Sequence, residues 1–165
     1  MSTETTDSKT WDVLATVEKW HNAADRKAGL PPDEVVEEKD NILLNAGITV
    51  LLNLLCGISS TAYSTGNAYI GVGDSTTAAA AGQTALQASS NKDYQGMESG
   101  YPSVSGQTVT FRSIWASSEG NFAWNEWTVA NGSSDSATNL NRKVAALGTK
   151  AGGSEWTLTV AITVS

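Results

Sequence analysis

The sequence contains a single cysteine and a single histidine. One cysteine excludes an intramolecular disulfide and any metal site built from several thiolates. Cys56 lies in an apolar run, where a free cysteine is usually a small buried hydrophobic residue, so we expect it to be buried. His21 follows Trp20 without a nearby nucleophile and orienting acid, and no catalytic triad is indicated.

Charged residues are also scarce. They make up 16% of the chain, against roughly 25% in typical soluble proteins. The net charge is −7 and the ten basic residues are scattered, which argues against a nucleic-acid partner. So few charged side chains are available to cover the solvent-exposed surface, and we expect a partner to bury part of that surface.

Long hydrophobic runs are absent as well. The strongest run, Ile42 to Cys56, is shorter than the roughly 20 residues that a bilayer requires, and Asn45 and Asn53 interrupt it. The first residues lack the basic and apolar regions of a secretory signal. The sequence therefore predicts a protein made in the cytoplasm, with no membrane partner.

Residues 1–40 form the first of two predicted parts. Residues 1–10 are polar and predict an arm without regular structure of its own. From Trp11 to Ala24 apolar residues recur at helical spacing, which predicts an amphipathic helix that ends before Pro31. The acidic stretch 33–40 predicts a short helix or a linker.

The second predicted part spans residues 41–165 and begins with a helix. Over Ile42 to Cys56 the polar residues repeat every four positions, and the rest of the surface is apolar. A helix that is apolar on nearly all sides is buried on nearly all sides. Asp40 or Asn41 can cap its start, and Gly57 stands where a glycine commonly ends a helix.

Alternating apolar and polar residues dominate the rest of the chain. They predict strands at residues 67–72, 108–115, 122–129 and 156–164, separated by Gly, Ser and Asn clusters. The predicted fold class is α+β, mainly β: an antiparallel β-sandwich with a buried helix, preceded by a helical N-terminal arm.

No motif indicates catalysis or a cofactor. The Gly71–Asp74 segment lacks the remaining residues of a nucleotide-binding loop, and a tight turn after a strand explains it. The acidic stretch lacks the spacing of a calcium loop, which favours a solvated face or a patch for a basic partner. A glycan hydrolase would need two converging carboxylates; the candidates are Glu98, Glu119, Glu126 and Glu155. We expect a non-enzymatic protein with no catalytic, cofactor-binding or metal-ligating residue.

Six tryptophans indicate buried surface, within the chain or between chains. Trp124 and Trp127 must point to opposite faces of a regular strand, so one of them is expected to face outward. An outward Trp can stack on a sugar ring or bury itself in a protein interface. The candidate interface residues are Trp11, Trp20, Asp33, Glu34, Glu37, Glu38, Trp124 and Trp127.

Several segments together resemble a family of tailed-bacteriophage virion structural proteins, described as minor capsid, decoration or tail-associated proteins. The resemblance covers roughly residues 40–165. It is carried by Asn41–Ile48, Tyr69–Thr76, Thr84–Leu86, Phe122–Trp127, Leu140–Lys143 and Trp156–Val160. It implies a part of the virion and no catalytic residues.

The leading expectation is a capsid decoration, or cement, protein that stabilises the assembled shell. Its partner would be the major capsid protein or another virion protein, reached through the arm and the acidic stretch. A homo-oligomer such as a trimer is expected, because copies of a compact domain pack readily around a rotational symmetry axis. The alternative is a tail or collar fibre component that binds host-surface carbohydrate through exposed Trp.

Overall fold

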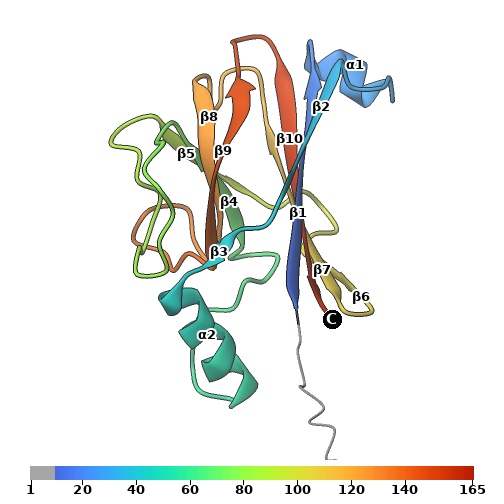
Figure 1. Ribbon diagram of the computed structural model, residues 1–165. Coiled ribbons are helices and arrows are strands. Elements are labelled where there is room, and N and C mark those ends of the chain that lie inside the picture. The colour runs from blue at the N-terminus through green and yellow to red at the C-terminus, as the bar shows by residue number, and fades with distance from the viewer. Residues whose placement is uncertain (1–9) are drawn as a thin grey trace, which may run out of the picture.

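Strands account for 44% and helices for 10% of the protein in a computed structural model that describes residues 10–165. Within that range the fold is mainly β, with two antiparallel sheets in a sandwich-like arrangement (Figure 1). The four predicted strands are confirmed as β4, β7, β8 and β10, with ends that shift by one or two residues where they differ.

The first sheet has the strand order β2-β1-β10-β7-β6. Its strands are β1 (Trp11–Trp20), β2 (Glu34–Lys39), β6 (Ser103–Ser105), β7 (Thr108–Trp115) and β10 (Glu155–Val164). The second sheet has the order β3-β9-β8-β4-β5. Its strands are β3 (Ile42–Leu43), β4 (Tyr69–Gly73), β5 (Lys92–Gly96), β8 (Ala123–Ala130) and β9 (Asn141–Thr149). The helices are α1 (Ala23–Lys27) and α2 (Asn45–Leu55).

The predicted amphipathic helix over residues 11–24 is wrong, because residues 11–20 form β1. This strand pairs along its whole length with β10, from Trp11 opposite Val164 to Trp20 opposite Glu155. The only helix in this region is the short α1, which Asn22 caps by accepting a hydrogen bond from the Asp25 N–H. The polar arm predicted for residues 1–10 lies, except for Thr10, outside the described residues.

The acidic stretch is also extended rather than helical or a linker. It forms β2, which pairs with β1 from Glu34 opposite Lys19 to Lys39 opposite Leu14. The two predicted parts on either side of residue 40 therefore share one sheet with β10.

Tryptophan rings fill the space between the sheets. Trp124 packs edge-on against Trp115 and Trp156, with ring centroids 4.8 and 4.9 Å apart. Trp127 is buried in the same core as Trp124, although the two lie three positions apart on β8. The register between β8 and β9 shifts between Trp124 and Glu126, and such an irregularity lets a strand turn both rings inward.

The outer face of the second sheet is covered by the segment 74–91. Glu126 of β8 and Arg142 of β9 are fully buried beneath it and form an ion pair, with 2.6 Å between Arg142 Nη2 and Glu126 Oε2. Glu126 accepts hydrogen bonds from the backbone N–H groups of Gln87 and Ala88, while Arg142 donates to Gln83 Oε1 and the Thr77 carbonyl. Two opposite charges thus fasten an Ala-rich segment to the sheet.

Gly73 is the last residue of β4, and residues 74–80 form no turn, so the tight turn predicted at Gly71–Asp74 is wrong. A Cβ at Gly73 would lie 2.5 Å from Glu126 Oε1. The glycine is required because the buried carboxylate approaches the strand closely, and not because of a positive φ angle.

Candidate functional site

Helix α2 lies at one end of the sandwich, beyond the ends of the strands in Figure 1. The prediction that this helix is buried on nearly all sides is wrong, because only Gly47 and Val50 are buried along it. Five large apolar side chains of this region are exposed: Ile48, Leu52, Leu54, Leu55 and Ile58. Leu55, at the end of the helix, is 82% exposed.

The start and end of α2 are fixed by close backbone contacts. Leu44 stands at the N-cap with no side-chain cap, in place of the predicted Asp40 or Asn41, and its N–H donates to the Leu140 carbonyl. A Cβ at Gly47 would lie 2.5 Å from the same Leu140 oxygen, so only glycine permits this approach. Gly57 has φ +70° and follows the helix, as predicted from its position.

A groove runs between α2 and the first sheet. Its volume is about 430 Å³. The residues that line it are largely apolar, and they come from α2 and the following loop, from β1, β6, β7 and β10, from the turn between β6 and β7, and from the residue before β9: Trp11, Leu51, Leu54, Ala62, Tyr63, Val104, Gly106, Gln107, Thr108, Val109, Phe111, Leu140, Ile162 and Val164. Val104, on the short edge strand β6, is 76% exposed.

None of the residues that line the groove or stand on α2 is charged. Between Asp40 and Asp74 the sequence contains no Asp, Glu, Lys, Arg or His, and the same holds between Glu98 and Arg112. We call the exposed side of α2 together with the adjoining groove the apolar end. Contiguous apolar surface of this kind commonly marks a site of association.

The tryptophans predicted at an interface lie mostly inside the protein. Trp124 and Trp127 have no exposed surface, so the expectation that one of them faces outward is wrong. Trp20 is buried and donates through Nε1 to the Leu30 carbonyl at 3.0 Å. Trp11 is the exception, because it is half-buried and lines the groove of the apolar end.

The four acidic candidates lie on or beside β2, at one edge of the first sheet. Asp33, Glu34 and Glu37 are exposed and Glu38 is half-buried. Glu34 pairs with Lys19 at 3.0 Å, and Lys19 in turn lies 4.5 Å above the centre of the Trp156 ring. Because β2 pairs only with β1 among the described strands, its other edge is open.

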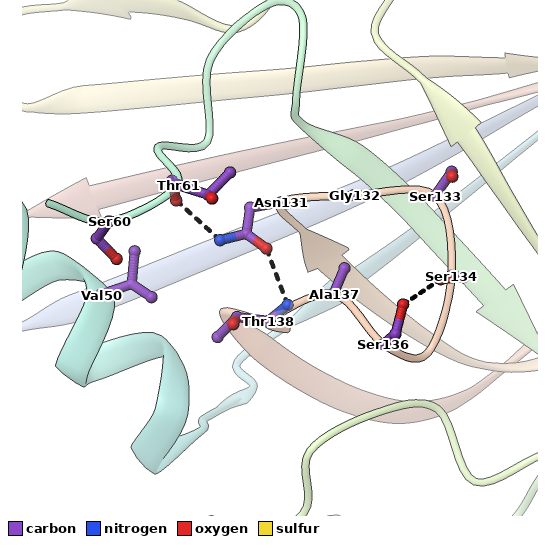
Figure 2. A pocket seen from close by; sticks show the side chains of 10 residues that line it. All are labelled: Val50, Ser60, Thr61, Asn131, Gly132, Ser133, Ser134, Ser136, Ala137 and Thr138. Carbon is purple, nitrogen blue, oxygen red and sulfur yellow. Dashed lines mark hydrogen bonds between the residues drawn. The ribbon is translucent and has the colours of Figure 1, made fainter.

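A polar pocket of about 430 Å³ lies between the loop 131–138 and the segment after α2 (Figure 2). Its lining includes Ser60, Thr61, Ser133, Ser136 and Thr138. Asn131 holds the pocket together by donating to the Thr61 carbonyl and accepting from the Thr138 N–H, both at 2.8 Å (Figure 2). The pocket therefore presents neutral hydroxyl groups on a braced loop.

The four carboxylates considered for catalysis have structural partners. Glu126 is paired with Arg142 under the segment 74–91, and Glu98 and Glu155 both pair with Arg26. Glu119 accepts a hydrogen bond from the Ala116 N–H. Among residues 10–165 no group of three or more His, Cys, Asp or Glu side chains is arranged to hold a metal ion.

His21 and Cys56 are both exposed. The expectation that Cys56 is buried is wrong, because it stands at the exposed C-terminal end of α2. Its position makes it a natural reporter on the apolar end.

Sequence reasoning missed Lys150, a buried lysine. Its ammonium donates to the Ala116 carbonyl at 2.7 Å and to Asn121 Oδ1 at 3.0 Å. Burial lowers its pKa below the usual value, because the charged form loses hydration, and nearby carboxylates, chiefly Glu119, act in the opposite direction. These contacts brace the turn between β7 and β8.

Comparisons with known proteins leave the family open: no family model, no curated protein and no solved structure matches this chain. Within residues 10–165, no helix is both long enough and apolar enough to cross a membrane.

Proposed function

We propose that this chain is a structural protein of a tailed-phage virion, most simply a decoration protein that binds the assembled shell and stabilises it. The observation that carries the proposal is the apolar end. The core between the two sheets is already filled by tryptophan and aliphatic side chains, yet Leu52, Leu55 and Ile58 remain exposed. A block with a complete core and an uncovered apolar surface suits assembly into a larger structure.

The acidic edge at β2 is the proposed contact with the shell. Asp33, Glu34 and Glu37 present carboxylates along an open strand edge. Charges on an edge strand discourage non-specific strand pairing, while they favour a partner with complementary basic residues. Many such weak contacts, repeated over a shell, add up to stable attachment.

Co-sedimentation with purified expanded phage shells tests this function. We expect saturable binding that weakens as salt is raised, and a higher melting temperature of the decorated shells. Glu37→Lys, which changes the charge of the β2 edge by two units, is expected to weaken binding about tenfold, the loss of a single favourable charge contact of roughly 1.4 kcal/mol.

The matched control is the double substitution Ser89→Lys with Ser90→Lys, which changes the net charge equally on the exposed segment over the other sheet. It should bind shells with much less loss. Failure of the native protein to bind shells at any salt concentration would contradict the proposed function.

A second candidate is a tail or collar fibre component that binds host-surface carbohydrate. Trp124 and Trp127 are buried, so they cannot offer an exposed ring on which a sugar could stack. The hydroxyl-lined pocket of Figure 2 favours it instead, because neutral hydroxyls and amides are suitable partners for sugar hydroxyls. Binding to a glycan panel without any binding to shells would select this candidate.

A further inference from the structure

The apolar end contains both an exposed row of apolar side chains on α2 and the groove beside it. Ile48, Leu52 and Leu55 follow one another along the exposed side of α2 at spacings of four and three residues. This spacing gives one continuous apolar stripe on a helix. Immediately beside the stripe lies the groove lined by Leu54, Val104 and Phe111.

From this juxtaposition we infer that the occupant of the apolar end is a second copy of the same chain. The helix stripe of one copy packs into the groove of its neighbour, and the neighbour's stripe packs into a groove in return. A surface that holds both complementary shapes can close on itself by symmetry, as self-complementary interfaces do.

Charge favours a second copy over other occupants. The chain carries a net charge of −7, so identical copies repel one another wherever charged surfaces meet. The residues of α2 and those that line the groove include no charged side chain. Two copies of the chain can therefore pack together at the apolar end without burying an unpaired charge.

The acidic edge would stay outside such a contact. Strand β2 lies at the edge of the first sheet formed with β1, whereas the groove opens toward β6 and β7 at the other edge of that sheet. Self-association and the proposed contact with a shell therefore use different surfaces. The inference deepens the proposed function and names the partner of the apolar end, but it is tested without shells.

The experiment is sedimentation velocity with light scattering on the full chain at micromolar concentration, without shells. The native protein is expected to form a closed oligomer. Leu55→Glu places a charge on the most exposed residue of the stripe, where it does not disturb the core, and should weaken association at least about a hundredfold. Circular dichroism of the variant should match the native spectrum.

The matched control is Val35→Glu, which adds the same charge at an apolar residue that is 50% exposed on β2. This variant should remain oligomeric. Cys56 supplies a second readout, because it is the single cysteine and stands at the end of α2. Its reaction with a thiol reagent should be slow in the native oligomer and fast in Leu55→Glu.

A native protein that stays monomeric at these concentrations would overturn the inference, and so would an oligomer that Leu55→Glu leaves intact. A monomer that binds neutral phosphatidylcholine vesicles through Leu55 would show that lipid is the occupant instead. Oligomers that do not bind shells would overturn the proposed shell contact and leave this inference standing.

Discussion

Glu126 and Arg142 form a fully buried ion pair, and each charge has further hydrogen bonds to the covering segment 74–91. A buried pair is a weak source of net stability because both charges lose hydration. Its value here is positional, since the carboxylate and the guanidinium specify where residues 77, 83, 87 and 88 lie against the sheet.

Removal of one partner of this pair should lower the free energy of unfolding by far more than the intact pair contributes to it. Arg142→Ala leaves the Glu126 carboxylate buried without its counter-charge, and we expect the free energy of unfolding to fall by about 3–5 kcal/mol. Chemical denaturation followed by tryptophan fluorescence measures this loss.

The control is Lys92→Ala, which removes the partly exposed Lys92–Asp135 ion pair and should change stability by less than about 1 kcal/mol. Equal effects of the two substitutions would mean that the buried pair does not organise the segment 74–91.

These residue-scale features were beyond prediction from the sequence. Nothing in a linear pattern pairs Arg142 with Glu126 on the neighbouring strand. The orientation of Trp127 depends on a register shift between β8 and β9, which a strictly alternating pattern cannot anticipate. Both features arise from the pairing of strands that are formed by separate parts of the chain.

At the scale of elements, β10 shows what the sequence could predict and β1 shows what it could not. Trp156, Leu158, Val160 and Ile162 face the core and alternate with two threonines and an alanine. In β1 the inward positions include Ala15 and Lys19, which blur the alternation and leave a helical spacing of the larger apolar residues. Lys19 is accommodated because its ammonium lies over Trp156 and pairs with Glu34.

Helix α2 was predicted as a helix, and the structure confirms it over Asn45–Leu55. Its burial was predicted wrongly for a physical reason. A helix that is apolar on nearly all sides indicates that most of its surface avoids water, but the pattern does not say whether the covering surface comes from the same chain.

The attachment of α2 depends on Gly47. An alanine normally favours a helix over glycine by about 0.5–1 kcal/mol. Here the added methyl group would lie 2.5 Å from the Leu140 carbonyl, a backbone atom that cannot move aside without disturbing β9. We expect the clash to dominate, so that Gly47→Ala lowers the free energy of unfolding by roughly 1–3 kcal/mol.

Gly82→Ala is the matched control, because nothing lies within 4 Å of a Cβ at that position. It should leave the denaturation midpoint nearly unchanged. A Gly47→Ala protein as stable as the native chain would show that α2 can shift away from Leu140 freely.

At the scale of the whole molecule, the charges and the apolar surface are kept apart. Arg112 of β7 pairs with Glu98, Arg26 of α1 pairs with Glu98 and Glu155, and the carboxylates of β2 lie along the edge of the first sheet. Helix α2, strand β6 and the residues that line the adjoining groove include no charged side chain. The two proposed contacts, with a second copy through the uncharged surface and with a shell through the acidic edge, would therefore not compete for the same residues.

If copies cover one another's apolar ends, the stability of the native protein must depend on its concentration. Unfolding then requires dissociation, and mass action raises the melting temperature as protein is added. For a chain of this length we expect a rise of roughly 1–3 °C for each tenfold increase in concentration. Leu55→Glu should melt at a temperature independent of concentration, because its unfolding is that of a single chain. Differential scanning calorimetry over two decades of concentration makes the comparison, and a native melting temperature that does not move would mean that the apolar end stays uncovered in solution.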